Sequence, residues 1–152
     1  MSLPKPIISI VTPTYNREDE LIHLIESIQR QSLSPEYFEM IISDDGSTDG
    51  TAEKVKELQK EISFNLLYIS QKNLGPGAAR NNGVNNSNGE LIVFIDSDCE
   101  ADIDWLKNIF NSYKNNEFDA FGGPDLARKS FLPIQRAINF SMTSFLTTGG
   151  MR

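Results

Sequence analysis

The chain has 152 residues, 39% of them hydrophobic, which is enough for one domain with a sizeable core and too few for two ordinary domains. Its 14 lysines and arginines against 21 aspartates and glutamates give a formal charge of -7, which argues against a nucleic-acid-binding protein because such proteins need a basic face. The single cysteine cannot form an internal disulfide, the first residues lack the features of a signal peptide, and no run reaches about 18 apolar residues. These features favour a cytoplasmic protein.

Apolar segments rich in β-branched residues alternate with amphipathic helical patterns. In chain order, the patterns predict a strand at 7–13, a helix at 18–31, a strand at 38–45, a helix at 51–62, a strand at 65–70, a helix at 75–86 and a strand at 91–95. Each of the first two helices has one apolar stripe, formed by Leu21, Leu24, Ile25 and Ile28 and by Val55, Leu58 and Ile62. This order predicts an α/β fold with a mostly parallel sheet flanked by helices.

Two more elements are predicted after the fourth strand. A helix begins at a capping residue, either Asp102 or Asp104, and carries an apolar face of Trp105, Ile109, Phe110 and Tyr113. A short strand follows at residues 119–123.

Two acids separated by one residue follow the strand at 91–95. The carboxylates of Asp96 and Asp98 repel each other unless water or a cation receives them. Mg²⁺ or Mn²⁺ suits such a pair, because these ions take oxygen ligands from one or two carboxylates and let phosphates complete the shell. The alternative for these residues is a solvated strand end followed by a helix cap.

Each of the four strands is followed by a polar segment, and ligands of open parallel sheets bind at this carboxyl edge. The four segments read TPTYNR, DDGSTDG, QKNLGPGAAR and DSDCE. In the second segment, the residues from Gly46 to Thr51 suit a turn and a helix cap. A cap needs one acceptor, so we expect at least one of Asp44 and Asp45 to be available to a ligand hydroxyl or imide.

The glycine-rich third segment differs from both common nucleotide-binding loops. Gly75 and Gly77 are followed by Arg80 where a dinucleotide fingerprint has its third glycine, and no phosphate loop of the G-x-x-x-x-G-K-[ST] type is present. What remains is a glycine turn at a helix start, with Arg80 one turn into the helix. Its guanidinium could face an anion or pair with a neighbouring acid, and the sequence leaves both alternatives open.

Taken together and in order, the four segments VTPTYNR, SDDGSTDGT, NLGPGAARNNGV and FIDSDCE resemble the family 2 glycosyltransferases over about residues 5 to 125. The nucleotide-sugar domain of that family has the Rossmann-like GT-A fold, and FIDSDCE corresponds to its D-x-D motif. The resemblance implies that Pro13 and Tyr15 flank the base and that Asp45 accepts a hydrogen bond from it. It implies further that Asp96, Ser97 and Asp98 meet the ribose, the diphosphate and a metal. Asp98 would be the direct metal ligand and Asp96 would lie nearer the ribose and sugar, while Arg80 is a further candidate for the nucleotide-sugar site.

The resemblance also implies an inverting transferase that moves a sugar from a nucleotide donor, usually UDP-linked, to a glycan, lipid or other hydroxyl acceptor with Mg²⁺ or Mn²⁺. We therefore expect a nucleotide-sugar-binding domain at residues 1–125 and the incomplete helical start of an acceptor-binding part at 126–152. The family's general base lies on that acceptor-binding half, so we expect it beyond the chain end.

The C-terminal segment is predicted to need a partner. A helical face of Ile134, Ile138, Met142 and Phe145 is accompanied by further apolar residues off this face. We expect it to pack against the acceptor half, another copy in a homodimer, or the cytoplasmic face of a membrane.

Two other functions are compatible with parts of the sequence. A nucleotide-sugar-binding module without turnover would need the same pocket but no base. A phosphatase of the haloacid dehalogenase type also places D-x-D after an apolar strand, but it would want Thr near position 100, where this chain has Glu100, and further acids downstream.

Overall fold

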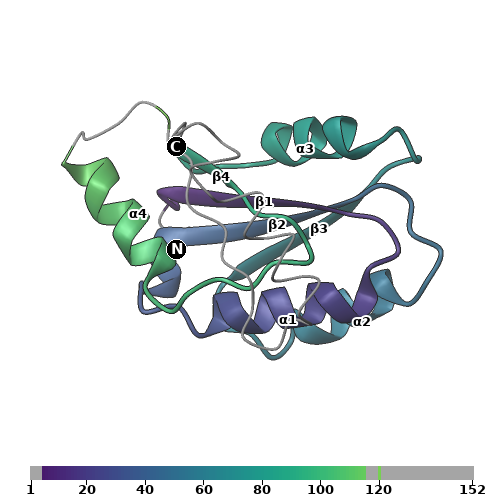
Figure 1. Cartoon of the computed structure of the whole chain (residues 1–152), viewed down its shortest axis with the longest axis horizontal. Coiled ribbons are helices and arrows are strands. Elements are labelled where there is room, and N and C mark those ends of the chain that lie inside the picture. The colour runs from purple at the N-terminus through teal and green to yellow at the C-terminus, as the bar shows by residue number, and fades with distance from the viewer. Residues whose placement is uncertain (1–4, 116–119, 121–152) are drawn as a thin grey trace, which may run out of the picture. The chain divides into compact units, whose positions relative to one another are not determined.

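Four parallel strands form the sheet of the computed structural model, which describes residues 5–115 and residue 120 (Figure 1). The strands are β1 (Ile8–Thr14), β2 (Phe38–Asp44), β3 (Asn65–Ser70) and β4 (Leu91–Phe94), in the order β3-β2-β1-β4. All seven residues of β1 and all seven of β2 are buried, because each strand is paired on both edges and covered on both faces. The predicted α/β fold with a parallel sheet is therefore confirmed.

The order of the strands creates a switch point in the sheet. From β1 the chain moves outward through β2 to β3, and it then returns to pair β4 with the other edge of β1. The connections after β1 and β4 therefore diverge at the carboxyl ends of two adjacent strands. In open α/β sheets this divergence leaves a crevice in which ligands bind.

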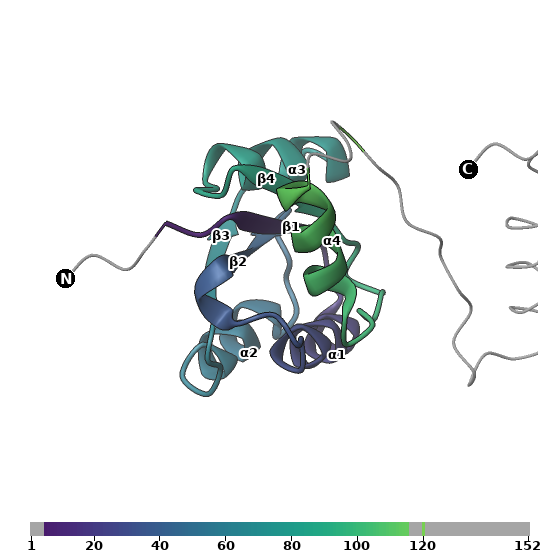
Figure 2. The same cartoon turned by 90° about the vertical axis from the view of Figure 1, so that its left-hand side faces the viewer.

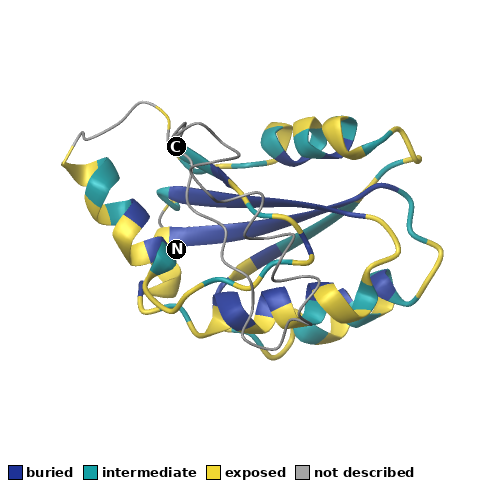
Figure 3. Ribbon diagram, in the orientation of Figure 1, coloured by how far each residue is buried: buried dark blue, intermediate teal, exposed yellow. Residues whose placement is uncertain are grey.

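Helices cover the two faces of the sheet unequally. Helices α1 (Glu18–Gln29) and α2 (Thr51–Leu58) lie on one face, and α3 (Pro76–Asn85) lies on the other (Figure 2). The α1 face holds the main core, to which α1 contributes its predicted stripe (Figure 3). The α3 face is tighter and uses small residues: Ala79 and Gly83 are buried, and a Cβ on Gly83 would overlap the Val11 side chain.

Helix α4 (Trp105–Lys114) starts directly after Asp104, one of the two predicted caps. Its apolar face differs in part from the prediction, because Leu106, which was not assigned to it, is fully buried together with Ile109. Phe110 contacts Tyr37 of the short 3₁₀ helix η1 (Pro35–Tyr37), with 5.1 Å between the ring centroids.

The strand β4 is less buried than its apolar sequence predicted. Only Val93 of its four residues is buried, and Phe94 is 50% exposed. The reason is position: within the described residues β4 pairs on one edge only, with β1. A continuous apolar run indicates that a strand can be buried on both faces. It does not indicate whether other described residues cover both faces.

The chain divides into two compact units, residues 1–114 and 115–152, and every element above belongs to the first. The predicted strand at 119–123, the helix after Pro124 and the domain boundary at 125/126 lie outside the described residues, so they stay predictions. No helix within the described residues is long and apolar enough to cross a membrane.

Candidate nucleotide-sugar site

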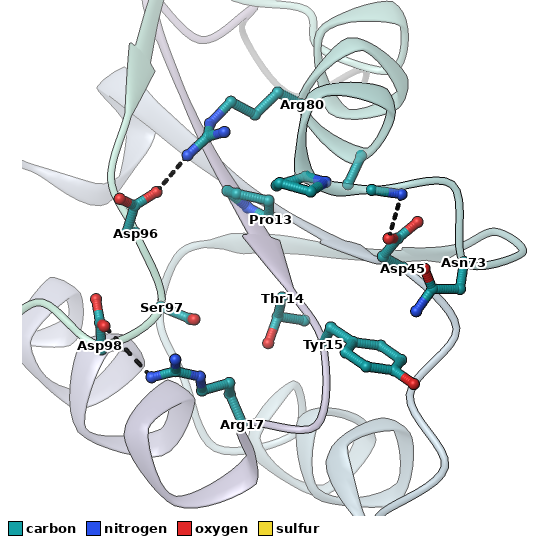
Figure 4. Close-up of a pocket in the computed structure, with 13 residues that line it drawn as sticks. Pro13, Thr14, Tyr15, Arg17, Asp45, Asn73, Arg80, Asp96, Ser97 and Asp98 are labelled. Carbon is teal, nitrogen blue, oxygen red and sulfur yellow. Dashed lines mark hydrogen bonds and ion pairs between the residues drawn. The ribbon is translucent and has the colours of Figure 1, made fainter.

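An open pocket of about 430 Å³ lies at the carboxyl edge of the sheet, at the switch point between β1 and β4 (Figure 4). Three chain segments that are distant in sequence meet here, after β1, after β4 and at the start of α3, together with the residue that follows β2. The pocket is lined by all seven residues predicted for the nucleotide-sugar site, which are Pro13, Tyr15, Asp45, Arg80, Asp96, Ser97 and Asp98. Their convergence is a finding of the structure; their roles in binding remain predictions.

Tyr15 stands at the mouth of the pocket with 45% of its surface exposed, while Pro13 is buried at the end of β1. The backbone just after Tyr15 is fixed by Asn16, which adopts the left-handed φ of 51° that asparagine tolerates. The Asn16 N–H donates to Ser47 Oγ and its Oδ1 accepts from the Thr48 N–H, both at 2.8 Å. These hydrogen bonds fix the backbone next to Tyr15, and the exposed ring lies where a planar base could stack on it.

The adjacent acids Asp44 and Asp45 have different surroundings. Asp44 is 1% exposed and accepts hydrogen bonds from the Ser47 N–H and hydroxyl, the Tyr68 hydroxyl at 2.9 Å and Ser70 Oγ. Burial is the main reason that the pKa of Tyr68 lies above its ordinary range, and the hydrogen bond from its hydroxyl to Asp44 raises the pKa further. Asp44 therefore ties the turn after β2 to β3 and does not line the pocket.

Asp45 lines the pocket and is itself held by three donors. Its Oδ1 accepts from Gln71 Nε2 at 2.8 Å and the Leu74 N–H at 2.9 Å, and its Oδ2 accepts from the Gly75 N–H at 2.7 Å. The bond from Leu74 is the main reason that the pKa of Asp45 lies below its ordinary value; burial acts in the opposite direction and the bonds from Gln71 and Gly75 add to the lowering. An ionised carboxylate has about four lone-pair sites, so Asp45 can still accept one bond from a ligand.

Gly46 allows this arrangement. Its φ is +85°, and a Cβ would lie 3.0 Å from the Gln71 backbone oxygen and 3.2 Å from the Asn73 nitrogen. The segment after β3 can therefore approach the turn closely enough for its backbone and Gln71 to reach Asp45.

Arginines pair with both acids of the D-x-D segment. Arg80 Nη2 lies 2.7 Å from Asp96 Oδ1, and Arg17 Nη1 lies 3.3 Å from Asp98 Oδ2. Of the two alternatives for Arg80, the structure shows the pairing with a neighbouring acid, although its side chain also lines the pocket. Between the pairs, Ser97 is 8% exposed.

The residues present fit a divalent cation of the Mg²⁺ or Mn²⁺ kind only as a partial ligand set. Asp96 and Asp98 supply hard oxygen donors, and their side chains are 60% and 54% exposed at the pocket. No group of three or more acidic, histidine or cysteine side chains that could hold a metal occurs within the described residues. Two carboxylates suffice for Mg²⁺ when phosphate oxygens and water complete the shell, so these two side chains would hold the ion with the donor.

Sequence reasoning missed several residues that line the pocket, chiefly Thr14, Arg17 and Asn73. Arg17 belongs to the quoted segment TPTYNR and Asn73 to QKNLGPGAAR, so their position after a strand was the available signal. Nothing in the sequence indicated that Arg17 would meet an acid 81 residues away.

Residues 9–150 match the family model described as Glycosyl transferase family 2. The chain belongs to glycosyltransferase family 2. It is 35% identical over 112 residues to Glycosyltransferase GlyA of Streptococcus pneumoniae, covering 74% of this chain and 16% of that relative. It is also 35% identical over 114 residues to poly(ribitol-phosphate) beta-glucosyltransferase of Bacillus spizizenii, covering 74% and 18%.

Solved structures of two glycosyltransferases share the fold. Residues 1–349 of Staphylococcus aureus TarS in complex with UDP-GlcNAc superpose with a TM-score of 0.66 at 26% identity, over 78% of this chain and 37% of that one. The Pyrobaculum calidifontis mannosyltransferase with GDP-Man and Mn²⁺ gives 0.63 at 25%, over 70% and 32%. The predicted GT-A fold is thereby confirmed. The chain spans less than a fifth of the length of the two curated relatives above.

Proposed function

We propose that this glycosyltransferase family 2 chain binds the donor of an inverting glycosyltransferase, a UDP-linked sugar, in the pocket at the switch point. The observation that carries this proposal is the division of the pocket into two sides (Figure 4). Tyr15, Asp45 and Asn73 lie on one side, and the two arginine–aspartate pairs lie on the other. A nucleoside diphosphate has the same division, with a planar base at one end and charged phosphates at the other.

On the first side, Asp45 selects the base. Its pKa lies below the ordinary value of 3.8, so the carboxylate is ionised at neutral pH and can accept hydrogen bonds but cannot donate them. The uracil N3–H is a donor and fits this acceptor, whereas the corresponding cytosine nitrogen has a lone pair that the carboxylate repels. Tyr15 offers its exposed ring to the base face, and the Asn73 amide can donate to a base carbonyl.

On the second side, the charged residues hold the diphosphate. Arg80 can form charge-assisted hydrogen bonds to phosphate oxygens, and Asp96 and Asp98 would hold Mg²⁺ or Mn²⁺ beside them. Such an ion, when bound, neutralises charge on the departing diphosphate. Transfer further requires removal of a proton from the acceptor hydroxyl, and we assign that step to no described residue.

For the acceptor, the proposal names only a chemical class. One relative, from Campylobacter jejuni, is named a GalNAc(5)-diNAcBac-PP-undecaprenol beta-1,3-glucosyltransferase, and another is named a poly(ribitol-phosphate) beta-glucosyltransferase, so the two names contain a lipid-linked glycan and a polyol phosphate. We propose a glycan or lipid-linked hydroxyl acceptor here as well. Association with a membrane surface and a homodimer stay predictions that depend on residues 124–152.

Equilibrium binding tests the donor proposal. We expect calorimetry with Mn²⁺ to give tighter binding of UDP than of CDP by about tenfold or more, the value of one charged hydrogen bond. Equal affinities for UDP and CDP would contradict base selection by Asp45. GDP serves as a third ligand, because guanine also presents N–H donors and its larger ring system tests the fit of the pocket. Release of free sugar from the UDP-sugar would then separate an enzyme from a binding module without turnover.

A further inference from the structure

The proposed function gives Arg17 no role of its own, although its pair with Asp98 lies on the charged side of the pocket. Arg17 occupies the position before α1, and its Nη1 lies 3.4 Å from Glu20 Oε1. The same Nη1 lies 3.3 Å from Asp98 Oδ2 (Figure 4). The side chain is 46% exposed, and both Arg17 and Asp98 line the pocket. The Arg17 guanidinium therefore pairs with the same carboxylate, Asp98, that is expected to bind a divalent cation.

The charges on this side of the pocket cancel. Arg17 pairs with Asp98 and Arg80 pairs with Asp96, so these two arginines and two aspartates carry no net formal charge. A donor diphosphate adds at least two negative charges, and a divalent cation adds two positive ones. If the diphosphate and the cation bind together, the net charge of this side of the pocket stays at zero. The cation then displaces Arg17 from Asp98, and Arg17 needs a new negatively charged partner.

The energies favour such an exchange. A half-exposed ion pair such as Arg17–Asp98 is weak in water, because solvent screens it. A guanidinium can bind a phosphate with two parallel charge-assisted hydrogen bonds, which are stronger and more specific in geometry. The bond between Arg17 and Asp98 is therefore weak enough to open when a cation and a diphosphate arrive.

We propose that Arg17 is a charge-exchange residue of the donor site. In the nucleotide-free pocket it neutralises Asp98, and in the donor complex it turns to the diphosphate while the divalent cation takes Asp98. This inference rests on the proposed function, since it assumes a diphosphate at this side of the pocket.

The exchange predicts opposite effects of one substitution. In Arg17→Ala, Asp98 loses a competing cation, so the nucleotide-free protein should bind Mn²⁺ up to about fivefold more tightly. The same variant lacks a phosphate ligand, so its affinity for UDP at saturating Mn²⁺ should fall about tenfold or more. Its affinity for uridine, which has no phosphate, should stay unchanged.

The experiment uses the 152-residue chain and four variants, three at Arg17 and one at Arg30. Free Mn²⁺ is counted by electron paramagnetic resonance without nucleotide, and UDP and uridine are titrated by calorimetry. Arg30→Ala is the matched control, because Arg30 forms an exposed ion pair of the same length, 3.3 Å to Glu100, and does not line the pocket. Arg17→Gln provides a second neutral variant if Arg17→Ala melts earlier than the wild type. Arg17→Lys keeps the charge without the planar guanidinium and should fall between wild type and alanine.

Each outcome decides the inference separately from the proposed function. Tighter Mn²⁺ binding with weaker UDP binding in the neutral variants, and neither change in Arg30→Ala, supports the exchange. Unchanged Mn²⁺ and UDP affinities, an absence of Mn²⁺ binding by the wild type, or an equal loss of UDP and uridine affinity overturns it. Failure of the wild-type chain to bind UDP would instead overturn the proposed function.

Discussion

At the scale of single residues, the neighbours Asp44 and Asp45 show how one position decides a role. Asp44 is the last residue of β2 and is tied to β3 through Tyr68 and Ser70, whereas Asp45 is the first residue after the strand and borders the pocket. Successive side chains of a strand point to opposite faces, which separates the two carboxylates. The expectation that one acid is available to a ligand therefore applies to Asp45, although three donors already hold it.

We predict that Asp45→Asn weakens UDP binding by about tenfold or more. The amide removes the negative charge that the base N–H meets, and a hydrogen bond to a charged group is worth about 1.5 to 3 kcal/mol. Calorimetry with UDP and Mn²⁺ measures the change. Asp19→Asn is the control, since Asp19 is exposed in the first turn of α1 and does not line the pocket. Equal losses in the two variants would remove Asp45 from the site.

The lowered pKa of Asp45 gives a prediction for stability against pH. A carboxyl group with a folded-state pKa below its ordinary value of 3.8 stabilises the fold above that value, and the contribution is lost as pH falls through the folded-state pKa. Wild type and Asp45→Asn should therefore differ most in free energy of unfolding near neutral pH and converge below about pH 4. Urea unfolding across this range provides the measurement, and a difference that grows on acidification would contradict it.

At the scale of elements, a buried acid joins the strands at the edge opposite the pocket. Glu39 of β2 is 1% exposed and accepts bonds from Ser9 Oγ of β1 at 2.7 Å, Asn65 Nδ2 of β3 at 3.3 Å and the Asn88 N–H before β4 at 2.6 Å. One carboxylate thus connects the beginnings of four strands. Its donors come from positions 26 to 49 residues away, so no local pattern could reveal them.

We predict that Glu39→Gln lowers the free energy of unfolding by about 1 to 3 kcal/mol, because the new amide NH₂ must face donors and leaves a buried group unsatisfied. Urea unfolding measures the loss. Glu36→Gln, in the exposed turn of η1, should change stability by less than about 0.5 kcal/mol. Because Glu39 lies away from the pocket, UDP affinity of the folded variant should match that of the wild type, and a selective loss of UDP binding would contradict this assignment.

The sequence predicted the positions of helices and strands better than it predicted which residues of distant segments contact each other. Hydrophobic periodicity depends on neighbours within a few residues, so the alternation of strands and helices and the stripe of α1 are confirmed. Helix α2 ends at Leu58 and not at 62, because the backbone tightens there into bonds such as Lys60 N–H to Glu57 O. The pairing of Arg17 with Asp98 depends on where two separate loops meet, and only the assembled sheet determines that.

At the scale of the whole molecule, the strand order and the net charge of the chain both affect the pocket at the switch point. The switch point beside β1 brings the loops after β1 and β4 together, and those loops carry Tyr15 and the D-x-D acids. The chain as a whole carries a formal charge of -7, so its field opposes an incoming diphosphate. The described pocket holds five charged side chains, Arg17, Arg80, Asp45, Asp96 and Asp98, which sum to -1. A divalent cation at Asp96 and Asp98 would reverse that sign locally.

We therefore predict that the thermal stabilisation of the chain by UDP depends on Mg²⁺ or Mn²⁺. At a UDP concentration of about 100 times Kd, binding stabilises the folded state by about 2.7 kcal/mol, which corresponds to a rise in Tm of roughly 5 to 11 °C for a chain of this size. In EDTA the same UDP concentration should give less than about a third of this rise, since the acidic chain then repels the diphosphate without a neutralising ion. Uridine separates the two causes, because it lacks the diphosphate and its smaller shift should be the same with Mn²⁺ and with EDTA. Equal shifts by UDP in Mn²⁺ and in EDTA would show that the arginines alone compensate the diphosphate and that Asp96 and Asp98 serve the pocket only as their partners.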